Sequence, residues 1–130
     1  MKALLGILLM AHGLVHIPLP LAPGADGKVG TWLMDPARNW PLKALGAGGE
    51  TMKLASLTLV TLTALTFLIA GLSYFGFLVP AAWFRITLAA AAVISLVWLV
   101  LFWHPWLVVG LALDVACLLA VILDWTPATR

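Results

Sequence analysis

The stretch WLVVGLALDVACLLAVILDW, residues 106–125, decides the fold of this chain. Its length is about what a helix needs to cross the hydrocarbon core of a bilayer. Asp114 stands near the middle of the stretch, and a carboxylate at that depth costs about 2.5–3.5 kcal/mol on insertion scales. Ionisable groups inside spanning helices are rare, and they are usually paired or functional. Asp114 is therefore the first candidate for a functional residue.

Three further stretches, residues 3–21, 54–78 and 81–103, pass the same length test. Strands are disfavoured because open sheet edges cannot face lipid. The connections after residues 78 and 103 are too short for anything but antiparallel neighbours. The sequence predicts an all-α fold: an integral membrane four-helix bundle in up-down-up-down order, with residues 1–130 as one transmembrane domain. Tryptophans mark the predicted span ends, at headgroup level: Trp83, Trp103, Trp106 and Trp125.

The composition agrees with a membrane protein. Hydrophobic residues make up 64% of the chain and charged residues 9%, and the mean hydropathy is +1.13. Soluble domains average about 45–50% apolar and about 25% charged residues, so a water-soluble globule is excluded. The net charge is only +2 and the basic residues are scattered, so no nucleic-acid partner is expected. Cys117 is the single cysteine, which excludes an intrachain disulfide and a thiol pair for zinc.

One long loop remains, over residues 22–50. Aromatic and apolar side chains such as Trp32, Trp40 and Leu45 predict that it lies on the membrane surface as an interfacial connector. The alternative is a lid over the mouth of the bundle.

The sidedness of the chain rests on few residues. Basic residues divide four against three between the two sides, which does not decide a positive-inside argument. Lys2, before an apolar run, favours a cytoplasmic N-terminus. A lysine followed by an apolar run is also typical of a signal peptide, so cleavage of residues 3–21 is an alternative. However, no convincing small-x-small cleavage site precedes the loop. We expect a multi-pass protein of a bacterial inner membrane.

The first stretch carries the motif Ala-His-Gly-Leu-Val-His at residues 11–16. His12 and His16 are four residues apart and therefore share one helix face. Pro18 and Pro20 follow. If the helix continues through them, each proline removes the amide donor to the carbonyl four residues earlier, so this end would be kinked and locally polar.

Depth relates these histidines to the buried aspartate. His12 lies nine residues before the end of the first predicted span, and Asp114 lies nine residues after Pro105. These two ends face the same side of the membrane in an antiparallel bundle, so His12 and Asp114 are predicted to lie at matching depth. His16 lies one helical turn nearer the membrane surface on that side, and His104 lies at that surface.

Three interpretations of this cluster stay open. In the first, a His12–Asp114 hydrogen bond fixes the helix register, since polar contacts between membrane helices are common and worth about 0.6 kcal/mol on average. In the second, the cluster binds a cofactor: a quinone headgroup on His12 or His16, or a haem with a second axial ligand such as His104. In the third, His12, His16 and Asp114 hold a divalent metal ion as two imidazoles and a carboxylate.

The motif at residues 11–16, with three further apolar helices and Leu-Asp at residues 113–114, resembles small uncharacterised bacterial four-helix membrane proteins. The layout is also similar to that of the DoxX-like group, some members of which accompany quinone-linked oxidoreductases. The resemblance implies a four-helix membrane fold, and it assigns no catalytic residue.

The function expected from the sequence is that of a small accessory or interaction protein. A lipophilic cofactor such as quinone would bind between the first and fourth spans. The first alternative is a membrane-embedded redox or metal-dependent enzyme that uses His12, His16, Asp114 and His104. The second is a small transporter or channel, for which one bundle leaves little room. The expected partners are the lipid bilayer and either another membrane protein or a second copy of this chain.

Overall fold

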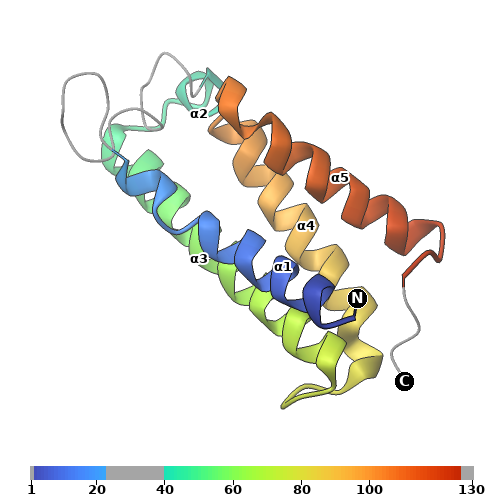
Figure 1. Ribbon diagram of the computed structural model, residues 1–130. Coiled ribbons are helices and arrows are strands. Elements are labelled where there is room, and N and C mark those ends of the chain that lie inside the picture. Colours follow the sequence, from blue (N-terminus) through green and yellow to red (C-terminus); the bar gives the residue numbers. More distant parts are fainter. Residues whose placement is uncertain (1, 23–39, 127–130) are drawn as a thin grey trace.

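The computed structural model describes residues 2–22 and 40–126. These residues form helices joined by turns and contain no strand (Figure 1). Four helical segments are long and apolar enough to cross a membrane, which confirms the all-α class and the four predicted spans. Most of the predicted interfacial loop, residues 23–39, lies outside the described residues. Of that loop the structure describes the short helix α2, Trp40–Ala44, and the turn after it.

The first span consists of α1, Lys2–Val15, and a 3₁₀ turn, Leu19–Leu21. The predicted span of residues 3–21 is confirmed, but its last residues do not continue the α-helix. Pro18 has no amide hydrogen, and the residue before a proline avoids the helical conformation. The amide of His16 instead lies 3.3 Å from the carbonyl oxygen of Gly13, three residues back. The chain thus leaves the helix at His16, rather than kinking within it.

The second span, α3, covers Gly49–Phe75, whereas hydropathy predicted residues 54–78. It begins earlier because the polar residues before the apolar stretch also join the helix. It ends earlier because Gly76 takes a left-handed conformation with φ 65°, and the amide of Gly76 bonds back to the carbonyls of the last turn. Hydropathy marks the part of a helix that suits lipid, and not the whole helix.

The last two spans each begin with a 3₁₀ turn that contains or follows a proline. The helix α4, Phe84–Leu101, follows the turn Ala81–Trp83, and α5, Val108–Ile122, follows the turn Pro105–Leu107. Both helices end a few residues before the predicted boundaries at 103 and 125.

The helices pack in chain order: α1 on α3, α3 on α4, and α4 on α5. The contact of α1 with α3 is close, because a Cβ atom on Gly13 would lie 2.5 Å from the Cβ of Phe67. Gly71 on α3 likewise has no room for a Cβ beside Met10. The helices α1 and α5 are not among the closely packed pairs, and a gap runs between them in Figure 1.

Two apolar clusters form the core. The first joins α1, α3 and α4 through Leu9, Phe67, Ala70, Tyr74, Phe84, Leu88 and Ala91. The second joins α3, α4 and the turn before α5 through Val60, Trp98, Leu99, Phe102 and Leu107. Each of the four spans carries a buried polar residue at a similar depth: His16, Thr63, Ser95 and Asp114. We call these four residues, together with His12, the polar layer.

Candidate functional site

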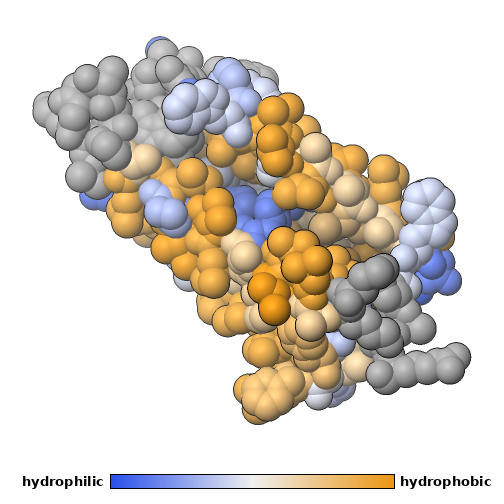
Figure 2. Space-filling view, viewed as in Figure 1, coloured by the Kyte–Doolittle hydropathy of each residue, from blue (hydrophilic) through white to orange (hydrophobic). Residues whose placement is uncertain are grey.

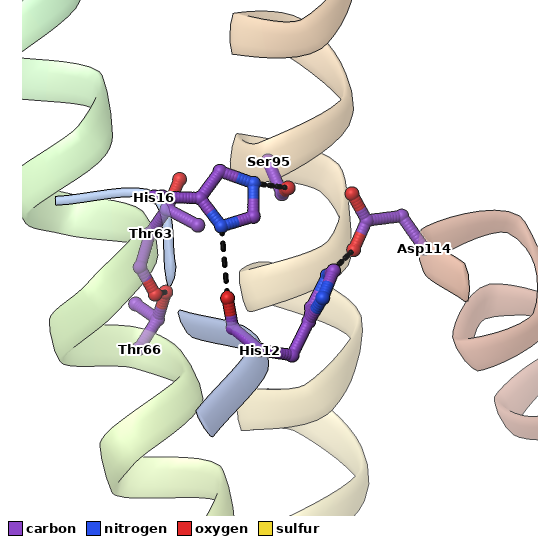
Figure 3. Close-up of polar contacts among 6 residues, drawn as sticks. All are labelled: His12, His16, Thr63, Thr66, Ser95 and Asp114. Atoms are coloured by element: carbon purple, nitrogen blue, oxygen red, sulfur yellow. Dashed lines mark hydrogen bonds and ion pairs between the residues drawn. The ribbon is translucent and has the colours of Figure 1, made fainter. Parts of the chain in front are cut away.

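The predicted pair of His12 and Asp114 is present at the centre of the polar layer. The Nε2 atom of His12 lies 2.9 Å from Oδ1 of Asp114, which links α1 to α5 (Figure 3). The Asp114 side chain is fully buried, and the His12 side chain is 14% exposed. A carboxylate accepts and cannot donate when ionised, so Nε2 of His12 carries the hydrogen. Counting residues from the span ends therefore placed both partners correctly.

His16 is held by two hydrogen bonds of its own. Its Nδ1 lies 2.9 Å from the carbonyl oxygen of His12, and its Nε2 lies 3.0 Å from Oγ of Ser95 (Figure 3). A carbonyl only accepts, so Nδ1 donates and Nε2 of the neutral ring accepts from the Ser95 hydroxyl. The proline-induced end of α1 thus places His16 between its own helix and α4.

Aromatic rings surround the two histidines. The His12 ring meets the rings of His16 and Phe67 edge-on, at centroid distances of 5.1 and 4.8 Å. The His16 ring meets Trp98 at 5.6 Å. These contacts leave the imidazoles little freedom to rotate, so the hydrogen-bond pattern is fixed by packing as well as by polar partners.

Within the described part of the chain, two buried side-chain atoms have no hydrogen-bond partner: Oγ1 of Thr63 and Oδ2 of Asp114. Both belong to the polar layer. An unsatisfied buried polar atom costs about 1–3 kcal/mol, and more when the group is charged. The orphaned oxygen of Asp114 is therefore the most costly atom of the site.

Two cavities lie along the gap between α1 and α5. The first, of about 470 Å³, is lined mainly by apolar side chains of α1, α4 and α5, including Leu8, Phe84, Ala116 and Cys117. The second, of about 510 Å³, reaches Leu19 and Trp106 at the span ends. His12, Val15 and Leu113 line both cavities. Figure 2 shows a hydrophilic patch at the bottom of a hollow between apolar ridges, where the gap lies in Figure 1.

His104 does not join the other predicted site residues. His12, His16 and Asp114 place one donor atom each within 4.8 Å of one another, and His104 is not in this group. It caps the turn before α5 instead, where its Nδ1 accepts from the amide of Trp106 at 3.2 Å. The haem interpretation, with His104 as the second axial ligand, stays a prediction.

Sequence reasoning missed Ser95 and the open side of the bundle. Ser95 gives little signal by itself, because a single serine in an apolar helix usually bonds within its own helix. Ser95 lies near the middle of the third span, at the depth of Asp114 and His12. This position could have indicated that Ser95 belongs to the same site. The sequence predicted a ligand between the first and fourth spans, but not that two cavities would lie between α1 and α5.

The arrangement at His12 resembles a carboxylate–imidazole dyad. Asp114 fixes the ring and its tautomer through Nε2, so Nδ1 of the neutral ring carries a lone pair. No described residue bonds to Nδ1, and the side chain lines both cavities. The ring can therefore accept a hydrogen bond or a proton from a molecule in the gap.

Comparisons of the chain with protein-family models, with curated proteins and with solved structures gave no match. The DoxX-like resemblance stays a prediction.

Proposed function

We propose that this chain is a small accessory protein of a bacterial inner membrane that binds a lipophilic ligand, such as a quinone, between α1 and α5. One observation carries the proposal. His12, in the middle of its span, is anchored by Asp114 through one nitrogen, has no partner among the described residues for its second nitrogen, and borders two cavities. A polar group placed in this way can orient a ligand whose remaining surface is apolar.

The size and lining of the cavities support a ligand of this chemistry. Sites for small molecules typically measure about 300–1,000 Å³ and are mostly apolar, with a few placed polar groups. The cavities of about 470 and 510 Å³ lie in this range. A quinone has an oxygen-bearing ring that suits His12 and an apolar tail that suits the side chains of Leu8, Phe84 and Ala116.

The outer face of α5 supports a role as an interaction partner. Only 11% of the α5 span is buried within the chain, and large apolar side chains such as Val108, Leu119 and Ile122 are exposed and line neither cavity. In a bilayer this face meets lipid, a second copy of the chain, or another membrane protein. An accessory subunit requires such a face.

The same geometry ranks the other functions. A transporter or channel is disfavoured, because apolar clusters lie on both sides of the polar layer within the described residues. A metal-dependent function has one observation in its favour, the donor group of His12, His16 and Asp114.

The test is quinone binding by the full chain, purified in mild detergent with a chelator present. A short-chain ubiquinone is titrated while tryptophan fluorescence is followed, since Trp106 lines one cavity. The parent is expected to show saturable quenching. Ala116→Phe fills the first cavity and should weaken binding about tenfold or more, and so should His12→Phe.

The matched control is Ala112→Phe, because Ala112 is exposed on the same helix and lines neither cavity. It should bind as the parent does. The proposal is wrong if the parent shows no saturable quenching, or if Ala116→Phe and Ala112→Phe bind equally well.

A further inference from the structure

The three ionisable residues of the polar layer form a compact donor set. One nitrogen of each of His12 and His16 and one oxygen of Asp114 lie within 4.8 Å of one another. His16 is 2% exposed and Asp114 is 0% exposed, so these groups are withdrawn from solvent. Two imidazoles and one carboxylate suit divalent transition metals, whereas Ca²⁺ and Mg²⁺ prefer oxygen ligands.

The orphaned oxygen of Asp114 points to a missing partner. Its Oδ1 is bonded to His12, but its Oδ2 is buried and has no partner among the described residues. In Figure 3 this second oxygen is turned away from His12, toward the side of Ser95 and His16. A cation on that side would remove the cost of the unpaired carboxylate oxygen.

The tautomer of His16 is already the one that a metal ligand needs. Its Nδ1 donates to the backbone carbonyl of His12, which leaves the lone pair on Nε2. Metal-bound histidines usually hold a carbonyl or carboxylate with the other ring nitrogen in this way. Ser95 now donates to Nε2, but a helical hydroxyl can turn to its own backbone, as Thr66 and Thr87 do in this chain.

The distances leave room for an ion after a small adjustment. Two atoms bound at a right angle, each about 2.1 Å from one ion, lie about 3.0 Å apart. The distance from His12 Nε2 to Asp114 Oδ1 is 2.9 Å. Two atoms bound to one ion at about 2.1 Å lie at most about 4.2 Å apart. A pair of donors near the 4.8 Å limit of the group therefore has to move slightly closer. The cavity lined by both histidines reaches Leu19 and Trp106 at the span ends, so an ion has a path from the headgroup side.

We propose that His12, His16 and Asp114 bind a divalent first-row transition-metal ion. Binding moves the proton of His12 from Nε2 to Nδ1 and frees His16 Nε2 from Ser95, so the ion replaces two hydrogen bonds. The ion also gives the buried carboxylate of Asp114, including its unpaired Oδ2, a positive partner. Three protein ligands leave at least one position for water or another small ligand. The site does not depend on the quinone proposal, because every ligand comes from the chain itself.

The test uses Co²⁺, whose visible absorption reports its coordination. The full chain, purified without a histidine tag and stripped with a chelator, is titrated with Co²⁺ alone, and bound metal is measured by elemental analysis. The parent should bind one ion per chain with visible ligand-field bands. Asp114→Asn keeps the size of the side chain and an acceptor for His12, and should weaken binding about tenfold or more.

Two further variants test the metal site independently, in case Asp114→Asn does not fold. Ser95→Ala removes the hydroxyl that competes for His16 Nε2, so it should bind Co²⁺ at least as tightly as the parent. His104→Gln removes a histidine outside the donor group and should leave binding unchanged. The proposal is overturned if the parent binds no stoichiometric Co²⁺, or if His104→Gln rather than Asp114→Asn abolishes the bands. Quinone binding, measured with chelator, is not affected by either result.

Discussion

The indole nitrogen of Trp98 on α4 lies 3.0 Å from Oγ of Ser56 on α3, and both side chains are completely buried. The hydroxyl accepts because an indole N–H can only donate. The bond joins two helices beside the second apolar cluster, to which Trp98 belongs. Water is absent from a bilayer core, so nothing else can satisfy the indole N–H there.

Replacing Ser56 by alanine should therefore destabilise the bundle. We expect Ser56→Ala to lower the free energy of unfolding by about 1 kcal/mol, since it leaves a buried donor unpaired. Thermal or chemical unfolding in detergent measures the change. Thr61→Ala is the control, because the Thr61 hydroxyl is exposed and bonds only within its own helix. Equal losses for the two variants would show that the bond between α3 and α4 contributes nothing.

Asp114 offers a second test of polar bonding. Asp114→Asn retains an oxygen acceptor for His12, so the unfolding free energy should change by about 0.5 kcal/mol or less. Asp114→Leu leaves the His12 Nε2–H without an acceptor and should cost about 1–2 kcal/mol. The two variants are compared by unfolding in the same detergent. If Asp114→Leu is as stable as the parent, the pair does not hold α1 to α5.

Glycine at position 13 should be needed for the contact of α1 with α3. Gly13→Ala places a Cβ 2.5 Å from the Cβ of Phe67, and overpacking of this kind costs about 1–3 kcal/mol. Gly110→Ala is the matched control, because its nearest neighbour is a Leu99 methyl at 3.7 Å, an ordinary contact. We expect Gly110→Ala to be neutral or stabilising by up to about 1 kcal/mol, since alanine favours helix. Unfolding midpoints in the opposite order would contradict the packing described here.

Thr63 should be more stable as valine. Its buried hydroxyl has no partner within the described chain, and valine has nearly the same shape without the polar atom. We expect Thr63→Val to raise the unfolding free energy by about 1 kcal/mol. Thr66→Val is the comparison, because the Thr66 hydroxyl bonds to the carbonyls of Leu62 and Thr63. A loss of stability in Thr63→Val would mean that the hydroxyl has a partner, such as a buried water.

Hydropathy and residue counting predicted much of this structure. Apolar length decides which segments suit lipid, so the four spans and the all-α class followed directly from the sequence. The His12–Asp114 pair followed because each residue adds a fixed rise along a helix, which fixes depth from the span ends. Helix ends were less predictable. Pro18 ended α1 early, while polar residues before position 54 extended α3.

The open side of the bundle could not be predicted, since it depends on which neighbours each helix prefers. Gly13 and Gly71 have no side chains, so α1 can pack closely on α3. Among the described residues, no similar close packing brings α1 onto α5. The position of His16 against Ser95 also arises only after folding, because it needs both the end of α1 and the rotation of α4. Neither the end of α1 nor the rotation of α4 leaves a periodic pattern in the sequence.

The gap between α1 and α5 determines the side from which His12 is reached. It opens on the flank of the molecule, which faces acyl chains when the spans lie in a bilayer (Figure 2). The concentration of a lipophilic molecule among the acyl chains is far above its concentration in water, so even a site of low affinity would be occupied. The membrane would then serve as the reservoir, and the protein would need only to select among the molecules dissolved in it.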